Sequence, residues 1–181
     1  MRIITGKYKS QVIEFPKSKL VRPTTDRNKE AIFNSLNNII DFEGISVCDL
    51  YAGSGSLGLE ALSRGAVLVD FVEMDFKVTQ TLQKNIQKLK AENSCKIFNR
   101  DCISFTSSIP VCKYDLILAD PPFFKDDIHQ VFFNIKTNNF LSEIGTVIIE
   151  RSIQTQKKDE VEFGLKPFKR LGDSLIYLFE I

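Results

Sequence analysis

The stretch ISVCDLYAGSGSLGLEALSRGAVLVDFVEMD, residues 45–75, decides the fold class of this chain. Its pattern indicates a strand, a glycine-rich loop, a helix that ends at Gly65, and a second strand. Strands that alternate with helices in this way favour right-handed crossover connections and a mainly parallel sheet. We therefore predict an open α/β sandwich around this strand, loop, helix and strand.

The rest of the chain extends the same alternation. The further predicted elements are a hairpin over residues 2–15 with its turn at Gly6, a helix within 22–40, a helix over 76–91, strands near 95–99 and 114–120, a helix over 126–137, and strands near 144–150 and 174–181. Little helix separates the last two strands, so we expect an antiparallel hairpin at the edge of the sheet. We divide the chain into a basic N-terminal appendage, residues 1–40, and a main domain, residues 41–181.

Gly53, Gly55 and Gly58 stand in G-x-G-x-x-G spacing between the first strand and its helix. Glycines at such positions let the chain turn sharply, let the backbone approach a ligand, and direct the helix N-terminus at negative charge. Glu73 ends the next strand 20 residues after Gly53, where a carboxylate accepts hydrogen bonds from the hydroxyls of a ribose. The combination favours a nucleoside cofactor over a purely structural turn.

This geometry suits both NAD and S-adenosylmethionine, and Asp101 does not choose between them. Asp101 follows the third predicted strand, where it is placed to accept a hydrogen bond from the adenine amino group of either cofactor. The same aspartate also fits a helix cap or a solvated loop, so both interpretations stay open at this stage.

The fourth predicted strand ends in ADPPFF, residues 119–124, at the carboxyl edge where open α/β sheets bind ligands. Pro121 and Pro122 fix the backbone and donate no hydrogen bonds. We predict that Asp120 and the Pro121 carbonyl accept the two hydrogens of an exocyclic amine, while Phe123 stacks on the heterocycle. The simpler alternative is that the prolines end a strand and the phenylalanines fill the core.

A pair of hydrogen-bond acceptors at this edge, from Asp120 and Pro121, is suited to catalysis. The amine of a purine is a weak nucleophile, because its lone pair is delocalised into the ring. Acceptors that draw its hydrogens out of the ring plane favour the tetrahedral nitrogen that attack requires, and they stabilise the developing positive charge. A sulfonium methyl group held by the glycine loop is a suitable electrophile, whereas hydride transfer has no use for an amine clamp. The sequence therefore favours S-adenosylmethionine.

Charge is distributed unevenly along the chain. Residues 1–30 contain eight Lys and Arg against three acids, whereas the other 151 residues contain 16 against 20. A basic segment ahead of a mildly acidic domain favours a polyanionic partner, because cations that neutralise phosphates release counterions. Lysines that serve only solubility are an equally simple alternative.

The composition favours a cytoplasmic protein without a metal. The cysteines, Cys48, Cys95, Cys102 and Cys112, form no C-x-x-C pair and His129 is the single histidine, so no zinc site is expected. No charge-free apolar run approaches the ~18 residues of a membrane span, and the N-terminus lacks an apolar signal segment. We expect a cytoplasmic monomer that makes no contact with a membrane.

Four segments, RPTTDRNKEAIFNSL, DLYAGSGSLGLEALSRGA, VEMD and ILADPPF, resemble the bacterial RsmD-type methyltransferases in order and separation, and the resemblance covers nearly the whole chain. It implies a Rossmann-like, S-adenosylmethionine-dependent methyltransferase fold. That fold has a seven-stranded, mainly parallel sheet with an antiparallel C-terminal hairpin and a small N-terminal hairpin-and-helix appendage. The resemblance also implies methylation of N2 of one guanine, guanine 966, in 16S ribosomal RNA, within the small ribosomal subunit or an assembly intermediate.

The resemblance assigns residues to three groups. The catalytic group, which holds the target amine, is Asp120, Pro121, Pro122 and Phe123. The cofactor group is Asp49, Ala52, Gly53, Ser54, Gly55, Gly58, Glu73, Met74, Asp101 and Cys102, with the glycines at the methionine part, Glu73 at the ribose and Asp101 at the adenine. The RNA group is Arg2, Lys7, Lys9, Arg22, Thr25 and Arg27. No residue is assigned to a metal.

The chain departs from the family pattern at Ser10 and Gln11, which replace the usual Gly-Arg and remove one cation from the expected RNA surface. The acid-Pro-Pro-aromatic motif also occurs in N6-adenine DNA methyltransferases, so an N6-adenine nucleic-acid methyltransferase is an alternative. A chain of 181 residues has no room for the separate recognition domain of a DNA enzyme, which favours an exposed base on a shaped RNA. A non-catalytic RNA-binding or ribosome-assembly factor is a further alternative, and an NAD oxidoreductase is the least favoured.

Overall fold

The computed structural model describes residues 1–15, 26–37, 39–122 and 125–180. The elements in chain order are α1 (Asp26–Leu36), β1 (Ser46–Leu50), α2 (Ser56–Arg64), β2 (Leu68–Val72), α3 (Phe76–Lys88), β3 (Cys95–Phe98), α4 (Cys102–Thr106), β4 (Tyr114–Ala119), α5 (Asp127–Thr137), β5 (Leu141–Ser152), α6 (Gln156–Phe163), β6 (Lys169–Leu171) and β7 (Ser174–Glu180), with short 3-10 turns at Glu92–Ser94 and Ile153–Thr155. Strands and helices alternate along most of this order, as the sequence predicts.

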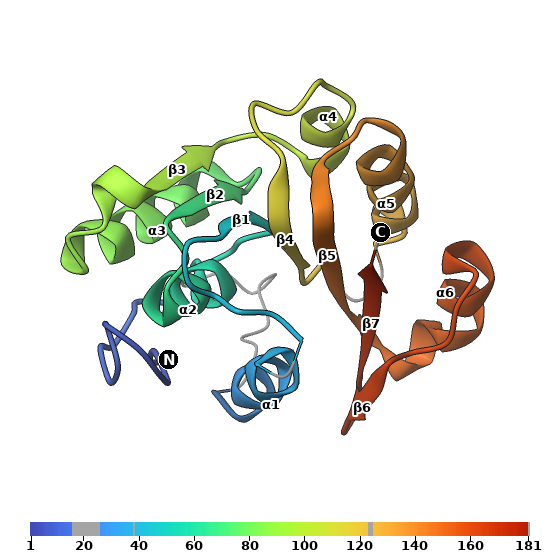
Figure 1. Ribbon diagram of the computed structural model, residues 1–181, viewed down its shortest axis with the longest axis horizontal. Helices are drawn as coiled ribbons and strands as arrows, with labels where there is room; N and C mark the ends of the chain where they lie inside the picture. Colours follow the sequence, from blue (N-terminus) through green and yellow to red (C-terminus); the bar gives the residue numbers. More distant parts are fainter. Residues whose placement is uncertain (16–25, 38, 123–124, 181) are drawn as a thin grey trace.

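The strands form one seven-stranded sheet in the order β3-β2-β1-β4-β5-β7-β6. The pairs from β3 through β5 are parallel, and β7 and β6 are added antiparallel at the edge. The prediction of a mainly parallel sheet with an antiparallel C-terminal hairpin is therefore confirmed. In Figure 1 the helices α1, α2 and α3 lie on one side of the sheet, and α4, α5 and α6 lie on the other.

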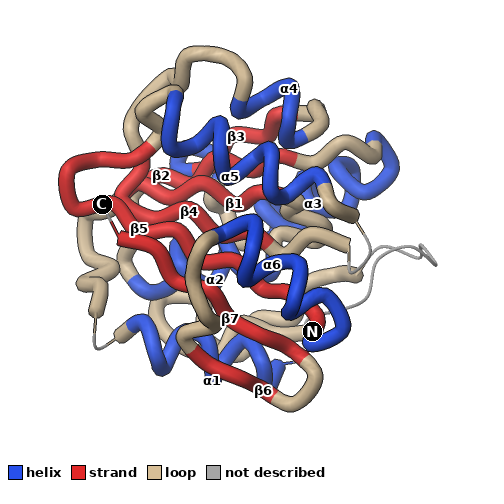
Figure 2. The backbone as a smooth tube through the Cα atoms, turned by 90° about the vertical axis from the view of Figure 1, so that its right-hand side faces the viewer, coloured by secondary structure: helices blue, strands red, loops and turns tan. Residues whose placement is uncertain are grey.

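Alternating side chains of the strands fill two separate cores. On β4, Leu116 and Leu118 pack with α1, α2 and α3, whereas Ile117 and Ala119 pack with α4, α5 and α6. The period of two along a strand sends successive residues to opposite faces, so a strand covered on both faces is apolar throughout. Figure 2, viewed from the α5 and α6 side, shows these helices in front of the strands.

Three elements, α4, α6 and β6, were not predicted from the sequence pattern. The α4 helix has only five residues, too few to show a helical periodicity. In α6, QKKDEVEF, only Asp159 and Phe163 are buried, so its apolar periodicity is too weak to indicate a helix. The strand β6 has three residues, and its Lys169 and Arg170 are exposed at the edge of the sheet. Such short, charged edge strands discourage pairing with other chains but leave little trace in a hydrophobicity pattern.

We call residues 1–15 the N-terminal arm. It folds back on itself through one bridge between Arg2 and Val12, with Ser10 N donating to Ile3 O at 2.9 Å. Ile3 and Ile13 are buried in the same core as α1, α2 and α3. Ser10 adopts a φ of 67°, a left-handed conformation that glycine adopts without strain. A serine at this position therefore strains the turn.

Within the described part of the chain, no helix has the length and apolar character needed to cross a bilayer. The same residues contain no group of three or more His, Cys, Asp or Glu side chains arranged to hold a metal ion. All four cysteines are free thiols, two of them buried and two half-buried.

Candidate functional site

The site lies where the sheet reverses its strand order. From β1 the chain proceeds to β2 and β3 on one side, whereas β4 and β5 pair on the other side of β1. Ligands of open α/β sheets bind at such a switch point, outside the carboxyl ends of the strands. Leu50 at the end of β1 pairs with Ala119 at the end of β4, so the glycine loop and Asp120 leave the sheet side by side.

The cofactor loop, which we define as residues 51–58, turns through three left-handed residues. These are Tyr51 with φ 57°, Gly53 with φ 55° and Gly55 with φ 81°. A Cβ on Gly55 would lie 2.4 Å from Leu82 of α3, and a Cβ on Gly58 would lie 2.4 Å from Phe71 of β2. Gly55 is thus required for both conformation and space, and Gly58 for the close approach of α2 to the sheet.

Two acids from neighbouring strands hold this loop by its backbone. The buried Asp49 accepts from Gly58 N at 2.8 Å, and Glu73 accepts from Gly53 N at 3.0 Å and from Asp75 N at 2.9 Å. Both acids were assigned to the cofactor from the sequence, and both lie against the loop.

The electrostatics of the loop are dominated by these carboxylates. Burial raises the pKa of Asp49 well above its usual value, against the hydrogen bond from Gly58, and the negative charges of Asp120 and Glu73 raise it further. Three carboxyl groups therefore interact at the switch point. Such a cluster favours a positively charged ligand.

Of the remaining predicted cofactor residues, Ala52 and Ser54 lie buried within the cofactor loop, and Met74, Asp101 and Cys102 lie around the ends of β2 and β3. Asp101 is exposed and caps α4, where it accepts from Ser104 N at 2.8 Å, and this bond lowers the pKa of its carboxyl. Met74 is exposed and Cys102 is buried. Asn99 donates to the carbonyls of Glu73 and Met74 at 2.9 and 3.0 Å, which ties the two strand ends together. Asp101 is thus observed as a helix cap, and its contact with adenine stays a prediction.

The acceptor loop, residues 120–126, follows β4. Asp120 is half-buried, Pro121 is buried and Pro122 is exposed. Lys125 N donates to the Pro122 carbonyl at 2.9 Å. Phe123, the predicted stacking residue, lies outside the described residues.

A buried ion pair, missed in the sequence, holds the far end of the acceptor loop. Arg151 at the end of β5 donates from Nη1 to the Lys125 carbonyl at 3.1 Å and makes two bonds to Asp159, at 2.9 and 3.1 Å. His129 Nε2 lies 2.8 Å from Asp159 Oδ1, and Thr155 donates to Asp159 Oδ2 at 2.6 Å. The sequence signal that could have revealed this ion pair is the presence of two charged residues, Glu150 and Arg151, in the otherwise apolar run VIIERS, residues 147–152.

Tyr51 was also missed, although it lies inside the quoted loop sequence. Its ring packs against the α4, α5 and α6 core, and its φ of 57° is unusual for a residue other than glycine. Burial raises the pKa of its phenol well above the usual value, and the neighbouring Cys102 and Asp127 raise it further. Tyr51 thus brings the first residue of the cofactor loop close to Asp127 at the start of α5.

The predicted RNA residues are divided between two places. Arg2 is exposed, its N donates to Asp26 at 3.3 Å, and its Nε lies 3.8 Å from the same carboxylate. Lys7 and Lys9 are exposed at the turn of the arm, where Lys7 N donates to the Ser63 carbonyl at 2.7 Å. Ser63 is near the C-terminal end of α2, roughly 8 Å along the helix from Gly58, the last residue of the cofactor loop. Arg22 and Thr25, and the side chain of Arg27, are outside the described part.

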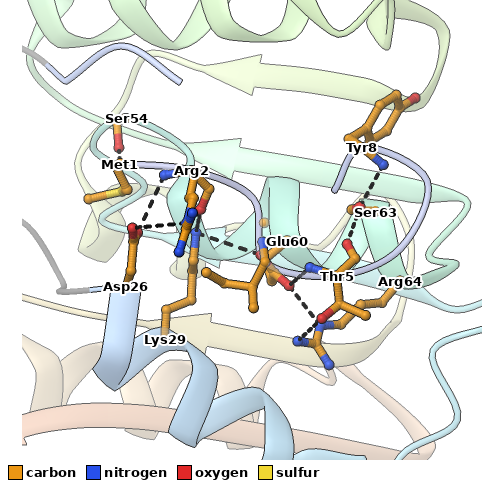
Figure 3. Close-up of polar contacts among 12 residues, drawn as sticks. Met1, Arg2, Thr5, Tyr8, Asp26, Lys29, Ser54, Glu60, Ser63 and Arg64 are labelled. Carbon is orange, nitrogen blue, oxygen red and sulfur yellow. Dashed lines mark hydrogen bonds and ion pairs between the residues drawn. The ribbon is translucent and has the colours of Figure 1, made fainter. Parts of the chain in front are cut away.

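The arm is anchored on α2 by a buried acid, as Figure 3 shows. Glu60 accepts from Ile4 N at 2.8 Å, from Thr5 N at 3.1 Å and from Arg64 Nε at 2.9 Å. Lys29 of α1 lies 3.6 Å from Glu60 and donates to the Arg2 carbonyl at 2.6 Å. Burial lowers the pKa of Lys29, and the charges of Glu60 and Asp26 oppose that shift.

A pocket of about 470 Å³ opens at this far end of α2, remote from the cofactor loop. Its lining residues are Thr5, Gly6, Asn37, Ile39, Ile40, Asp41, Phe42 and Arg64. None of them was assigned to a function from the sequence. The size of this pocket therefore does not mark the site, which is defined by the strand ends.

Known proteins resemble the chain over almost its full length. A family model described as conserved hypothetical protein 95 matches residues 1–180. Ribosomal RNA small subunit methyltransferase D of Escherichia coli K12 is 34% identical over 154 residues, which are 85% of this chain and 76% of that protein. The protein of that name from Haemophilus influenzae is 36% identical over 154 residues, 83% of this chain and 78% of its own. The solved structure of the Escherichia coli protein yhhF has a TM-score of 0.82 at 29% identity and covers 99% of this chain and 97% of that one.

Proposed function

This chain belongs to the conserved hypothetical protein 95 family, and from that premise we propose that it methylates ribosomal RNA. This family of methyltransferases uses S-adenosylmethionine as its cofactor. We propose further that the acceptor is the exocyclic N2 of a guanine in the small-subunit RNA, guanine 966 by the family resemblance. The observation that carries the proposal is the register of β1 with β4, which sets Asp120 beside the cofactor loop.

The residues of the cofactor loop fit S-adenosylmethionine. Its sulfonium is a cation, and the carboxyl groups of Asp49, Glu73 and Asp120 interact at the switch point, where a cation would favour their ionised forms. Glu73 already accepts from Gly53 N, but a carboxylate has about four acceptor positions, so it can also hold ribose hydroxyls. Asp101 keeps acceptor capacity for adenine in the same way. We propose that Ala52, Ser54, Met74 and Cys102 complete the cofactor contacts.

The acceptor loop supplies the chemistry of the target base. When bound, the cofactor supplies an electrophilic methyl group. We propose that the Asp120 carboxylate and the Pro121 carbonyl accept the two amine hydrogens and hold the nitrogen lone pair out of the ring plane. Because Pro121 is buried and its backbone torsion is restricted, its carbonyl is positioned before the base arrives. Pro122 and Phe123 complete the loop, with Phe123 as the stacking residue.

The N-terminal arm and α1 are proposed as the RNA-facing part, residues 1–40. Arg2, Lys7, Lys9, Arg22, Thr25 and Arg27 are the proposed contacts. The two lysines contact RNA phosphates away from the cofactor loop, because they lie at the other end of α2. RNA is long enough to reach both places, and phosphate contacts supply affinity without reading the sequence. We propose that the protein acts as a monomer.

Small ribosomal subunits from cells that lack the enzyme test this proposal. Incubation with methyl-labelled S-adenosylmethionine should label one nucleotide, which digestion should release as N2-methylguanosine. Release of N6-methyladenosine would show that the target base is adenine. The Asp-Pro-Pro-Phe stretch is compatible with either base, because it recognises an amine and not the base that bears it. An unlabelled subunit would contradict the proposed activity and favour an RNA-binding factor without catalysis.

A further inference from the structure

Asn85 of α3 is a fully buried amide outside the groups discussed so far. Its Oδ1 accepts from Glu14 N at 2.7 Å, and its Nδ2 donates to the carbonyls of Glu14 and Ser54, each at 2.9 Å. The partners fix the orientation of the amide, because a reversed side chain would set its NH2 group against the Glu14 N–H. One side chain thus joins three segments: the arm, α3 and the cofactor loop.

The two partners of Asn85 belong to different parts of the proposed site. Glu14 is in the last stretch of the arm, just before residues 16–25. Ser54 lies between Gly53, which is bound to Glu73, and Gly55, which packs on Leu82 one turn before Asn85. The α3 helix therefore packs against the cofactor loop through Leu82, and Asn85 of the same helix binds the loop by a hydrogen bond. A buried amide that loses its hydrogen-bond partners destabilises the fold, because its polar atoms are then left unsatisfied. We therefore expect the three hydrogen bonds of Asn85 to form together.

Among the described residues, the other anchors of the arm do not bind the backbone of the cofactor loop. Glu60 and Ser63 bind the arm to the body of α2, and Lys88 of α3 donates to the Val12 carbonyl at 2.6 Å. Met1 Sδ approaches Ser54 Oγ, but at 3.9 Å the contact is a weak one (Figure 3). Asn85 binds the loop backbone directly, and at hydrogen-bond distance.

We propose that Asn85 is a positioning residue that couples the N-terminal arm to the cofactor loop. The inference rests on the proposed function, in which the loop holds the cofactor and the arm faces RNA. When the arm is docked, Asn85 fixes the Ser54 carbonyl and so the shape of the loop. Because coupling between sites is reciprocal, a cofactor that orders the loop must also stabilise the docked arm, and RNA on the arm must favour the cofactor.

The test compares Asn85→Asp with Lys88→Ala and the wild type. Asparagine and aspartate have the same shape, but the carboxylate has no hydrogens for the Ser54 and Glu14 carbonyls. Lys88→Ala removes one bond from the same arm and the same helix without affecting Ser54. By calorimetry with S-adenosylhomocysteine, Asn85→Asp should bind at least ~5-fold more weakly than the wild type, and Lys88→Ala should match the wild type.

Hydrogen exchange supplies a readout independent of activity. In the wild type, S-adenosylhomocysteine should slow exchange at the arm amides of Ile3, Ser10 and Ile13, which are hydrogen-bonded within the arm. In Asn85→Asp the ligand should slow exchange only in the cofactor loop. If Asn85→Asp does not fold, Glu14→Pro deletes the arm N–H that Asn85 accepts, and it leaves α3 and the loop unchanged.

The outcomes separate the two proposals. Equal protection of the arm in wild type and variant, or no protection in the wild type, would overturn the coupling through Asn85 and leave the methyltransferase proposal intact. A wild type that does not bind S-adenosylhomocysteine would overturn the proposed function, and the coupling with it.

Discussion

The cofactor loop and the acceptor loop leave neighbouring strands, but they are held in different ways. The cofactor loop is fixed by acids at the ends of β1 and β2, Asp49 and Glu73, and by the amide of Asn85. The acceptor loop is fixed at Lys125 by Arg151 and its partner Asp159, which lie on β5 and α6. The first loop is therefore ordered by its immediate neighbours, whereas the second depends on the C-terminal part of the fold.

The largest expected effect comes from breaking the support of the acceptor loop. Arg151→Met leaves the Asp159 carboxylate buried without its main cation, which should lower the free energy of unfolding by about 3–5 kcal/mol. Below the unfolding temperature the variant should still bind S-adenosylmethionine, because the cofactor loop has separate supports. Denaturant unfolding and calorimetry measure the two quantities.

Lys158→Ala is the matched control for that variant. Lys158 pairs with Asp126 of the acceptor loop at 2.6 Å, but both side chains are about half exposed. Water screens an exposed pair of this kind, so this variant should unfold almost like the wild type. If Arg151→Met weakened cofactor binding as much as turnover, the two loops would not be independently supported.

Within the acceptor loop, Asp120→Ala should have the next largest effect. Loss of an acceptor positioned for the transition state should cut the methylation rate by at least ~10²-fold, while affinity for S-adenosylmethionine stays close to that of the wild type. Single-turnover labelling of ribosomal subunits measures the rate. Asp126→Ala removes an exposed acid from the same loop and should leave the rate unchanged. Normal turnover by Asp120→Ala would remove Asp120 from the mechanism.

Addition of one methyl group to the cofactor loop should lower the stability of the protein. Gly58→Ala places a Cβ against Phe71 and Val69 of β2, at 2.4 and 2.8 Å, and this overpacking should cost about 1–3 kcal/mol of stability. Thermal unfolding with and without S-adenosylhomocysteine measures the loss. Gly164→Ala is a contrasting variant that tests backbone strain alone, since Gly164 has a φ of +70° and open space around it, whereas Gly58 lies inside α2 and tests overpacking alone. A Gly58→Ala protein as stable as the wild type would show that α2 can move away from the sheet.

The smallest effect is expected at the turn of the arm, which lies at the other end of α2 from the cofactor loop. Replacement of Lys7 and Lys9 by Ala should weaken RNA binding and reduce the slope of log affinity against log salt by about one unit for each phosphate that is no longer neutralised. Titration over a salt series measures the slope, with Lys157→Ala on α6 as the control. An unchanged slope would mean that these lysines serve only solubility.

The contrast between the loops also explains what could be predicted from the sequence. Glycine spacing and strand-end acids are local signals, so the parallel strands around β1 and the places of Glu73 and Asp120 at strand ends followed from the pattern. Asp49 was assigned only through the family resemblance, and the strand order was not predicted. Asp159 lies on α6, a helix that was not predicted, and it binds Arg151 of β5. The sequence around either residue does not indicate which residue it will pair with. Long-range polar contacts of this kind depend on tertiary packing and not on local periodicity.

The same reasoning applies to the N-terminal segment. Its basic charge was visible, but Glu60 and Asn85, which dock it, lie in helices whose sequences gave no reason to single them out. Their buried polar side chains are satisfied by backbone groups of the arm, a kind of contact that single-sequence patterns do not record. The distance of Lys7 and Lys9 from the cofactor loop follows from this docking and was not expected from the sequence.

The docking of the arm on α2 and α3 also has a consequence for biosynthesis. Ile4 is 56 residues before its partner Glu60, and Glu14 is 71 residues before Asn85. A chain that emerges at roughly 5–20 residues per second needs several seconds to deliver these partners after the arm has left the ribosome. Contacts of such sequence separation also form late, because chain entropy decreases before they stabilise the fold. The residues of the arm are thus translated before their partners and dock late, and the nascent protein carries an undocked cationic segment in the meantime.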